Sequence, residues 1–213
     1  MIEKKFFTDR PELETASPVR GSAFGFTALE LLITVAIVGV VTALAVPVLR
    51  GFVLDQRAVS RLNEFVAAVN LARNEAVKRG MPVTLCASAS PQAVIKPACD
   101  GRKQWEKGWI LFADYDRDAK LDLGTDACLA GEDCLLRVWE GIDDMTLRAG
   151  RTRITFDDMG ASRGFNATWR LCDERGVQAA RAVVLSPSGR LRQAVDSDGN
   201  GILNGGSRDI SCP

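Results

Sequence analysis

The sequence predicts an α+β fold in which a long N-terminal α-helix precedes a domain built from an antiparallel β-sheet. Two features of the 213-residue chain lead to this prediction. Residues 31–49 form an apolar run without a charge, and the apolar residues after it recur every three or four positions up to Arg79, which is the period of an α-helix. From Pro82 onward, short runs rich in Val, Leu, Ile and Trp alternate with Gly, Pro, Asp and Ser, a pattern typical of antiparallel strands.

The composition narrows the classes of function. The 27 basic residues equal the 27 acidic residues, so the overall charge indicates neither a nucleic-acid-binding protein nor a protein with an acidic partner. The chain has no histidine, which removes the usual general base near neutral pH and the commonest metal ligand. Serine and cysteine hydrolase triads of the familiar kind are therefore disfavoured.

The apolar run is long enough to cross a membrane. About 20 apolar residues span a hydrocarbon core of about 30 Å as a helix, and a permanent anchor, a buried core helix and a secretory signal peptide all fit the run. The main alternative to an anchor is a secreted, disulfide-rich β domain, because Ala43-Leu44-Ala45 fits a small-x-small cleavage site after Ala45. Glu30 at the head of the run, and a helical pattern that continues past Ala45, favour the anchor.

The second half of the predicted helix is amphipathic. One face is apolar and carries Leu54, Ala58, Leu62, Phe65, Val69, Ala72 and Ala76. Gly80 and Pro82 follow Lys78 and Arg79, and a glycine followed by a proline is a typical end signal for a helix. We therefore predict one helix over residues 27–79.

Seven short runs are predicted as strands. They lie at residues 83–88, 108–114, 135–140, 154–158, 167–173, 181–186 and 190–194. No helical pattern of 10–15 residues recurs between them, so a doubly wound parallel sheet is disfavoured. Residues 114–134 form an acidic insertion between two of these strands.

All six cysteines lie beyond the apolar run, and none forms a Cys-x-x-Cys pair. An even number of cysteines in one compartment indicates three disulfides in an oxidising space, and scattered buried thiols are the alternative. Proximity in sequence favours Cys86–Cys99 and Cys128–Cys134. The remaining pair is then Cys172–Cys212.

The start of the apolar run resembles a known processing site. Gly25-Phe26-Thr27-Ala28-Leu29-Glu30 is similar to the site in type IV prepilins and type II secretion pseudopilins. The resemblance implies that a prepilin peptidase cuts after Gly25 and that the new N-terminal residue, Phe26, is methylated. Gly39 and Pro47 fall where this family often has a glycine and a proline that loosen the helix. The segment before Gly25 departs from the family because it is long and has no net positive charge.

Glu30 would be costly in a lone subunit. A charged side chain at the bilayer centre costs about 2.5–3.5 kcal/mol on insertion scales. A carboxylate one helical turn from a free amino terminus can be matched by the amine of its own or a neighbouring subunit, so packing into a filament would remove the unpaired charge. We expect Glu30 to set the register of assembly, as a single buried polar residue does in a coiled coil. The alternative is an interfacial acid that the helix dipole favours.

About residues 25 to 213 of the chain are similar to the GspH/FimT family of minor pilins and pseudopilins. The residues that carry this resemblance are Asn70 to Gly80, then Val83 to Cys86, Trp105, Gly108-Trp109, Asp114, Phe156 and Gly160. The family implies a leader at 1–25, a transmembrane or filament-core helix half at 26–49, an amphipathic half at 50–80 and a disulfide-bonded β domain at 81–213. It also implies a single-pass protein of the bacterial inner membrane with its C-terminal domain in the periplasm or on a filament, assembled with other pilins or pseudopilins. Such a protein is expected to be a structural and binding protein and not an enzyme.

The C-terminal region offers one candidate nucleic-acid contact. Ten arginines and no lysine lie between residues 148 and 208. Gly189, Arg190 and Arg192 form a Gly-Arg-x-Arg pattern that resembles the motif with which FimT-type pilins bind DNA during uptake. On a strand, Arg190 and Arg192 would share one face, and guanidinium groups suit phosphate oxygens. The alternative is a solvated strand face whose arginines pair with Asp157, Asp158 or Asp196.

Two acidic loops have spacings similar to a calcium loop. Asp196, Asp198, Asn200 and Asn204 place oxygens at positions one, three, five and nine with Gly201 at six, although Ser207 stands where a bidentate acid is usual. We expect weak calcium binding there or, alternatively, a polar turn. A second set is Asp114, Asp116, Asp118 and Asp122, but Ala119 replaces the glycine and Thr125 the final acid, and a hydrated acidic loop is the alternative. No other cofactor is expected.

Overall fold

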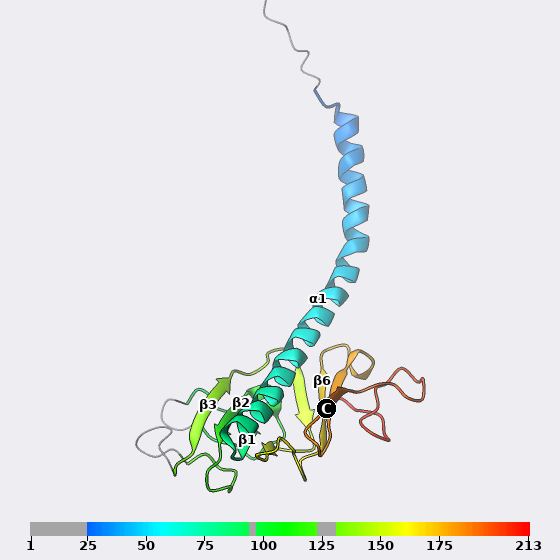
Figure 1. The fold of residues 1–213 in the computed structure, drawn as a ribbon. Helices are drawn as coiled ribbons and strands as arrows, with labels where there is room; N and C mark the ends of the chain where they lie inside the picture. The colour runs from blue at the N-terminus through cyan, green and yellow to red at the C-terminus, as the bar shows by residue number, and fades with distance from the viewer. Residues whose placement is uncertain (1–24, 94–96, 123–130) are drawn as a thin grey trace, which may run out of the picture. The chain divides into compact units, whose positions relative to one another are not determined.

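A computed structural model describes residues 25–93, 97–122 and 131–213 (Figure 1). The chain divides into two compact units, Met1–Val46 and Pro47–Pro213. The boundary between them falls inside the first helix, so one secondary-structure element contributes to both units.

The single α-helix of the described residues, α1, spans Ala28–Arg79, which confirms the predicted long helix to within one residue at its start. Thr27 caps the N-terminus because its Oγ1 accepts a hydrogen bond of 3.2 Å from the backbone N–H of Glu30. A side-chain oxygen at this position satisfies an amide that has no partner inside the helix. At the other end, Gly80 has a φ of +64° and the backbone N–H of Met81 donates to the carbonyl oxygen of Ala76, so the glycine ends the helix as predicted.

The part of α1 that belongs to the first unit exposes its apolar side chains. Among residues 25–46, only Ala45 is even partly buried. By length and composition, α1 could cross a membrane. The hydroxyls of Thr34 and Thr42 donate to the carbonyl oxygens of Leu31 and Val38, at 2.8 Å each. These hydroxyls are therefore satisfied by the helix itself, as an apolar environment requires.

The described residues of the second unit form two antiparallel four-stranded sheets. The first sheet has the order β3-β2-β1-β5 and consists of β1 (Val83–Ala87), β2 (Trp109–Ala113), β3 (Cys134–Trp139) and β5 (Arg153–Phe156). The second has the order β4-β6-β7-β8 and consists of β4 (Thr146–Ala149), β6 (Ala167–Cys172), β7 (Arg181–Leu185) and β8 (Leu191–Gln193). Two short 3₁₀ helices, η1 and η2, span Trp105–Lys107 and Val177–Ala179.

All seven predicted strands are present, and the antiparallel β domain is confirmed. β4 and the division into two sheets were not predicted. β4 has only four residues, and one of them is an arginine, so its pattern in sequence is weak. β4 pairs with β6, from Thr146↔Cys172 to Ala149↔Trp169, and not with β1, β2 or β3. It therefore belongs to a second sheet.

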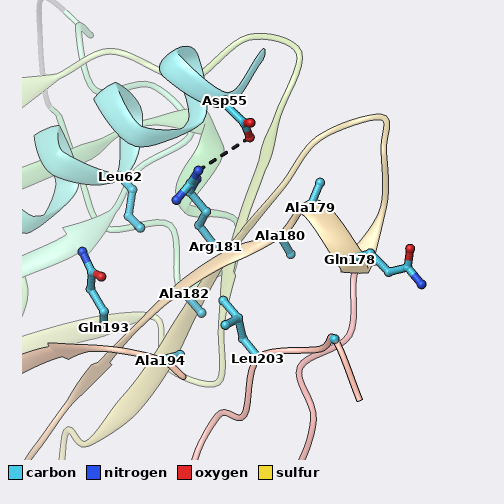
Figure 2. A pocket seen from close by; sticks show the side chains of 11 residues that line it. Asp55, Leu62, Gln178, Ala179, Ala180, Arg181, Ala182, Gln193, Ala194 and Leu203 are labelled. Atoms are coloured by element: carbon cyan, nitrogen blue, oxygen red, sulfur yellow. Dashed lines mark ion pairs between the residues drawn. The ribbon is translucent and has the colours of Figure 1, made fainter. Parts of the chain in front are cut away.

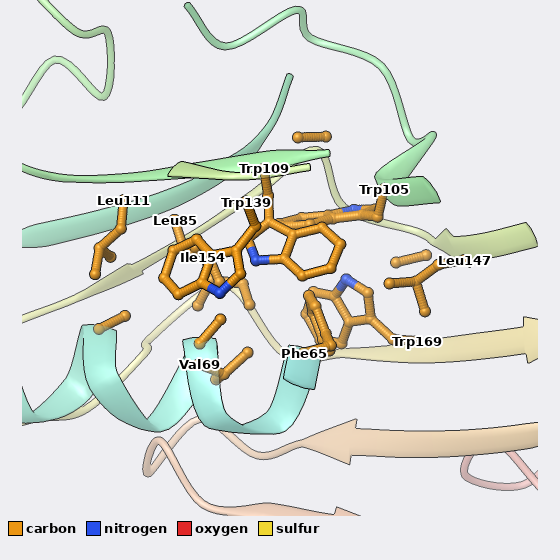
Figure 3. Packing of buried hydrophobic residues seen from close by; sticks show 14 of the residues in the cluster. Phe65, Val69, Leu85, Trp105, Trp109, Leu111, Trp139, Leu147, Ile154 and Trp169 are labelled. Carbon is orange, nitrogen blue, oxygen red and sulfur yellow. The ribbon is translucent and has the colours of Figure 1, made fainter. Parts of the chain in front are cut away.

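The core forms where the second half of α1 packs against both sheets. Phe65 of α1 is fully buried, and its ring centroid lies 5.5 Å from that of Trp105, 5.6 Å from that of Trp109 and 5.5 Å from that of Trp169 (Figure 3). Trp109 belongs to the first sheet and Trp169 to the second, so one helix residue joins the two sheets. Aromatic pairs of this kind contribute about 0.5–1.5 kcal/mol each beyond the area they bury.

Between described residues, two disulfides join strands to a loop or to the C-terminal segment. Cys86 of β1 is bonded to Cys99 with a Cα–Cα distance of 5.6 Å, and Cys172 of β6 is bonded to Cys212 with a Cα–Cα distance of 5.9 Å. These are two of the three pairings that the sequence favours. The third, Cys128–Cys134, lies outside the described residues because Cys128 does.

Candidate functional site

The segment that resembles a processing site is accessible. Gly25, Phe26 and Thr27 precede α1 outside any helix or strand, and Phe26 is 81% exposed. A Cβ added at Gly25 would meet nothing within 4 Å. A protease could therefore reach the Gly25–Phe26 bond without unfolding any described element.

Glu30 lies in the first turn of α1 with its side chain exposed. Within the described residues, its carboxylate has no hydrogen bond and no ion pair. It is also the only charged residue of the described helix before Arg50. An electrostatic partner of Glu30 would thus have to come from outside the described residues, from another copy or from another molecule.

Gly39 and Pro47 both lie inside α1. Proline has no backbone N–H, so Pro47 cannot donate the helical hydrogen bond to the carbonyl four residues earlier. A Cβ added at Gly39 would meet nothing within 4 Å, so no packing contact explains the glycine. α1 continues through both positions, and the helix-loosening role expected from the resemblance stays a prediction.

Arg190 and Arg192 are both exposed, but only Arg192 lies on a strand. β8 begins at Leu191. The backbone N–H of Ser186 donates a hydrogen bond of 3.0 Å to the carbonyl oxygen of Arg190 across the turn that joins β7 to β8. Gly189 is required in this turn: its φ is +77°, and a Cβ there would clash with the carbonyl oxygen of Gly160. The expectation that Arg190 belongs to the strand is therefore wrong.

The arginines do not pair as the alternative interpretation expected. No ion pair joins Arg190 or Arg192 to Asp157, Asp158 or Asp196 within the part of the chain that the structure describes. The Asp157 carboxylate instead accepts hydrogen bonds from the backbone N–H groups of Met159 and Ala161, at 3.1 and 2.8 Å. Two exposed guanidinium groups therefore remain available for a ligand.

The loop that begins at Asp196 is closed by its own hydrogen bonds. Asp196 accepts hydrogen bonds from the backbone N–H groups of Gly201 and Gly199, at 2.8 Å each, and these hold the pKa of the Asp196 carboxyl below its ordinary value. Oδ1 of Asn204 accepts from the backbone N–H and the hydroxyl of Ser197. Calcium binding by Asp196, Asp198, Asn200 and Asn204 stays a prediction, and these oxygens would have to exchange hydrogen bonds for the ion.

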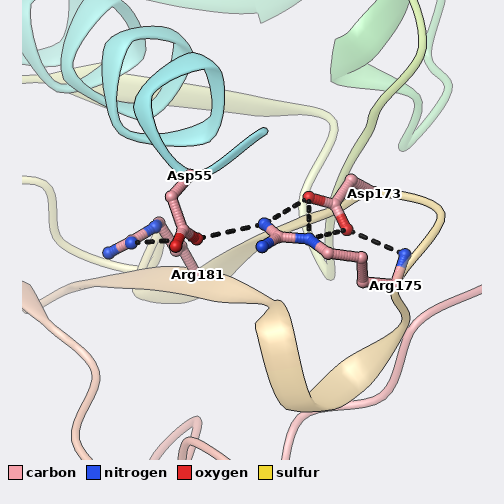
Figure 4. A network of polar contacts seen from close by, with 4 residues as sticks. All are labelled: Asp55, Asp173, Arg175 and Arg181. Carbon is pink, nitrogen blue, oxygen red and sulfur yellow. Dashed lines mark hydrogen bonds and ion pairs between the residues drawn. The ribbon is translucent and has the colours of Figure 1, made fainter. Parts of the chain in front are cut away.

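The sequence pattern missed two groups of residues. Asp133 lies beside the acidic set that follows β2, although it is distant from that set in sequence. A network also links α1 to the second sheet (Figure 4): Arg175 Nη2 lies 2.7 Å from Asp173 Oδ2 and 3.1 Å from Asp55 Oδ1, and Arg181 Nη2 lies 3.6 Å from the same Asp55 oxygen. No local spacing could have indicated either group, because both depend on tertiary contacts.

Burial and charge act against each other at Asp173. Burial raises the pKa of its carboxyl, but the hydrogen bonds and charge of Arg175 outweigh burial and bring the pKa below its ordinary value.

Next to this network, a cavity of about 340 Å³ lies between α1 and the second sheet, with Asp55, Leu62, Arg181 and Leu203 among its lining residues (Figure 2).

A model of the family "Type II transport protein GspH" matches residues 61–189, which is more than half of the chain. The chain belongs to the GspH family. The match includes most of the amphipathic helix half, both sheets except β8, and the turn as far as Gly189. Residues 25–47, Arg190, Arg192 and the loop from Asp196 lie outside it, so membership of the GspH family does not by itself assign roles to them.

Two solved structures are similar to the chain. Both are crystal structures of the type IV minor pilin FimU of Pseudomonas aeruginosa, in space groups P65 and P21, and each is 21% identical to this chain. The first covers 64% of this chain and 91% of its own, with a TM-score of 0.44; the second covers 65% and 88%, with a TM-score of 0.45. No curated protein matches this GspH family member.

Proposed function

We propose that this member of the GspH family is a minor pilin or pseudopilin that is anchored in the bacterial inner membrane and assembles into a filament. Residues 26–49 would form the anchor and, after assembly, part of the filament core. Other pilins or pseudopilins would be its partners, with the β domain in the periplasm or on the filament. The protein would act by assembly and binding, without catalysing a reaction.

Glu30 is the single observation that carries this proposal. It is a lone carboxylate in the first turn of a helix that is otherwise uncharged up to Arg50, and no described residue pairs with it. A charged side chain costs about 2.5–3.5 kcal/mol at the bilayer centre, and Glu30 lies at the head of the apolar run. The amine of a processed N-terminus, on the same or a neighbouring subunit, would relieve this cost when subunits pack together.

The first test is the mass of the native N-terminus. A prepilin peptidase that cuts after Gly25 and methylates the product leaves methylated Phe26 as the first residue. Mass spectrometry of the protein purified from its own membrane should detect this species. An N-terminus at Val46 would instead show a secreted β domain released by a signal peptidase, and would contradict the proposal.

The second test removes the charge and keeps the shape. In Glu30→Gln, we expect the fraction of protein recovered in filaments to fall at least about tenfold, because a tenfold change needs only about 1.4 kcal/mol. Glu64→Gln is the matched control, since Glu64 pairs with Arg61 on the exposed side of the amphipathic half. Normal incorporation of Glu30→Gln into filaments would show that the carboxylate does not direct assembly.

Two systems could use such a subunit. The name of the matched family favours type II secretion, where the domain would contribute to protein secretion. The exposed Arg190 and Arg192 favour a second candidate function, DNA binding by a type IV pilus component during uptake. Their guanidinium groups have no ion pair in the described part of the chain, although Arg192 Nη1 donates a hydrogen bond of 3.5 Å to the carbonyl oxygen of Gln193. Exposed arginines without an acidic partner suit phosphate oxygens.

DNA binding can be tested by its salt dependence. Arg190→Ala combined with Arg192→Ala should weaken binding of the detergent-solubilised chain to duplex DNA and reduce the slope of log affinity against log salt by about 2, which corresponds to two lost phosphate contacts. Arg102→Ala combined with Lys103→Ala removes the same charge from another exposed segment and should leave the slope unchanged. Absence of binding at low salt would restrict the proposal to secretion.

A further inference from the structure

A buried carboxylate lies at the end of β2. Asp114 follows the strand directly and is fully buried. Its Oδ2 accepts hydrogen bonds from Thr84 Oγ1 at 3.0 Å and from the backbone N–H of Ala119 at 3.1 Å. Its Oδ1 is also buried but has no hydrogen-bond partner among the described residues. A buried acceptor without a partner costs about 1–3 kcal/mol, so native proteins rarely keep one without a reason.

Other carboxylates gather around Asp114. Ligand oxygens of Asp114, Asp116 and Asp133 all lie within 4.8 Å of one another, and so do those of Asp116, Asp118 and Asp122. Asp116 belongs to both groups. Two oxygens that ligate one Ca²⁺ at about 2.4 Å can be at most about 4.8 Å apart, so the spacing of each group is short enough for a shared ion.

Asp133 shapes the loop around this cluster. It is buried, and it accepts hydrogen bonds from the backbone N–H of Tyr115 at 2.8 Å and of Asp122 at 3.0 Å. It lies one residue before β3. The acid that sequence spacing does not provide at Thr125 is therefore present at another position, brought to the loop by the pairing of β2 with β3.

The loop also adopts the backbone conformation that a glycine usually provides. Ala119 has a φ of +60°, in the left-handed region that favours glycine. The replacement of the expected glycine by Ala119 therefore does not prevent a tight loop. The backbone N–H of Ala119 donates a hydrogen bond to Asp114 Oδ2, and this bond holds the loop against the buried carboxylate.

Like charges make this arrangement unfavourable without a cation. Burial raises the pKa of the Asp114 carboxyl, and the charges of Asp133 and Asp116 raise it further. Among the described residues, the one ion pair in the cluster joins Lys120 Nζ to Asp118 Oδ2 at 3.0 Å. Lys120 is exposed and does not pair with the buried members. The side chains that bond to Asp114 or repel its charge are Thr84, Asp116 and Asp133. Arg117, Arg153 and Arg163 line a pocket together with Asp114, but none of them forms an ion pair with it among the described residues.

We infer that Asp114, Asp116 and Asp133 form a binding site for a divalent cation, Ca²⁺ in preference to Mg²⁺, with Asp118 and Asp122 on its outer side. The donors are all oxygens, and the chain has no histidine, which disfavours zinc and other metals that prefer nitrogen or sulfur ligands. Ca²⁺ accepts six to eight oxygens in flexible geometry, whereas Mg²⁺ demands a near-ideal octahedron. An irregular loop that contributes carboxylates from two segments fits Ca²⁺ better.

The ion would join the loop after β2 to the start of β3. It would bind the otherwise unpartnered Oδ1 of Asp114 and offset the repulsion among the carboxylates. The site lies inside the region that matches the GspH family, and the inference does not depend on whether the protein serves secretion or a pilus. Binding should stabilise the second unit, because only the folded chain brings Asp133 to Asp114.

The experiment measures thermal unfolding of the full chain in detergent after treatment with EDTA. Addition of about 10 mM CaCl₂, which is roughly ten times the dissociation constant of a weak extracellular site, should raise the Tm by about 3 °C or more. MgCl₂ at the same concentration should raise it less. A wild-type Tm that does not respond to Ca²⁺ would overturn the inference.

Asp116→Asn locates the site. Asp116 is exposed, and an asparagine in its place can still accept the hydrogen bond from the backbone N–H of Asp118. The variant should therefore fold. Near-ultraviolet circular dichroism of the tryptophan cluster, recorded in EDTA, checks that it does. The calcium shift should be lost in Asp116→Asn and kept in Asp198→Asn, the matched change in the other acidic loop. The opposite result would place the calcium site at residues 196–204 and overturn the inference.

Discussion

The two halves of α1 differ in where their apolar side chains are buried. In residues 47–79, Phe65 and its neighbours on one face are buried against both sheets. In residues 28–46, Leu31, Val38 and Leu44 are 61%, 59% and 70% exposed. From Ala58 onward, one face of the helix is buried by the chain itself. The residues before it, through Phe52 at 60% exposed, present an apolar surface to an environment outside the chain. Apolar residues that recur every three or four positions mark the part of the helix that packs on its own β domain. An uninterrupted apolar run instead indicates a membrane or an assembly partner.

The sharpest way to break this comparison is to truncate one side chain in each half. Phe65→Ala should lower the free energy of unfolding by about 4 kcal/mol, because it leaves a cavity among three tryptophans. Val38→Ala should change it by less than about 0.5 kcal/mol, as exposed positions do. Denaturant unfolding of the full chain in detergent, followed by tryptophan fluorescence, measures both. Similar losses in the two variants would mean that the halves of α1 are not partnered differently.

The next largest effect concerns the covalent link in the second unit. Replacing Cys172 and Cys212 together by Ser should lower the free energy of unfolding by about 3 kcal/mol, since the disulfide closes a long loop with a sequence separation of 40. The C-terminal segment should then become sensitive to limited proteolysis, while α1 stays resistant. Cys86→Ser with Cys99→Ser, whose separation is 13, should cost less. A larger loss in the second pair would contradict an account based on loop length.

The smallest effect tests the polar link between α1 and the second sheet. Asp173→Asn should lower the free energy of unfolding by about 1 kcal/mol at pH 7, because the carboxylate pairs with Arg175. The folded state holds the pKa of Asp173 below its ordinary value of 3.8, so the carboxylate stabilises the fold above that value. This contribution disappears as the pH falls through the lower pKa of the folded state.

Chemical denaturation at pH 7 and at about pH 2.5 measures the change with pH. The difference between wild type and Asp173→Asn should shrink at the lower pH. Asp158→Asn removes an exposed carboxylate that has no hydrogen bond among the described residues, and it should have little effect at pH 7. If the difference in free energy of unfolding between wild type and Asp173→Asn grew as the pH fell, the charged carboxylate would not be the form that stabilises the fold.

Much of the fold followed from local patterns. The helix was predicted to within one residue, and its buried face was predicted because apolar residues with the right period must face a core. Strand positions followed from alternation and from turn residues. β4 was missed because a four-residue strand carries little pattern, and Arg190 was wrongly assigned to a strand because the turn closed by Ser186 is a hydrogen-bonding feature that β propensity does not contain.

The acidic loop after β2 shows the same limit at a candidate site. Sequence spacing identified Asp114, Asp116, Asp118 and Asp122, but it treated Ala119 as an obstacle and had no reason to include Asp133. The backbone of Ala119 and the position of Asp133 depend on the pairing of β2 with β3. The buried, unpartnered oxygen of Asp114 could be recognised only once the strands around it were in place.

The sequence by itself determined the long helix, its apolar and amphipathic halves, the strands and the resemblance to a processing site before Phe26, because each of these depends on neighbours within a few residues. The tertiary structure alone decided the separation into two sheets, the meeting of Phe65 with three tryptophans, the network at Asp55 and the approach of Asp133 to Asp114. These contacts join residues that are far apart in the chain, and their energies depend on distances that no local pattern contains.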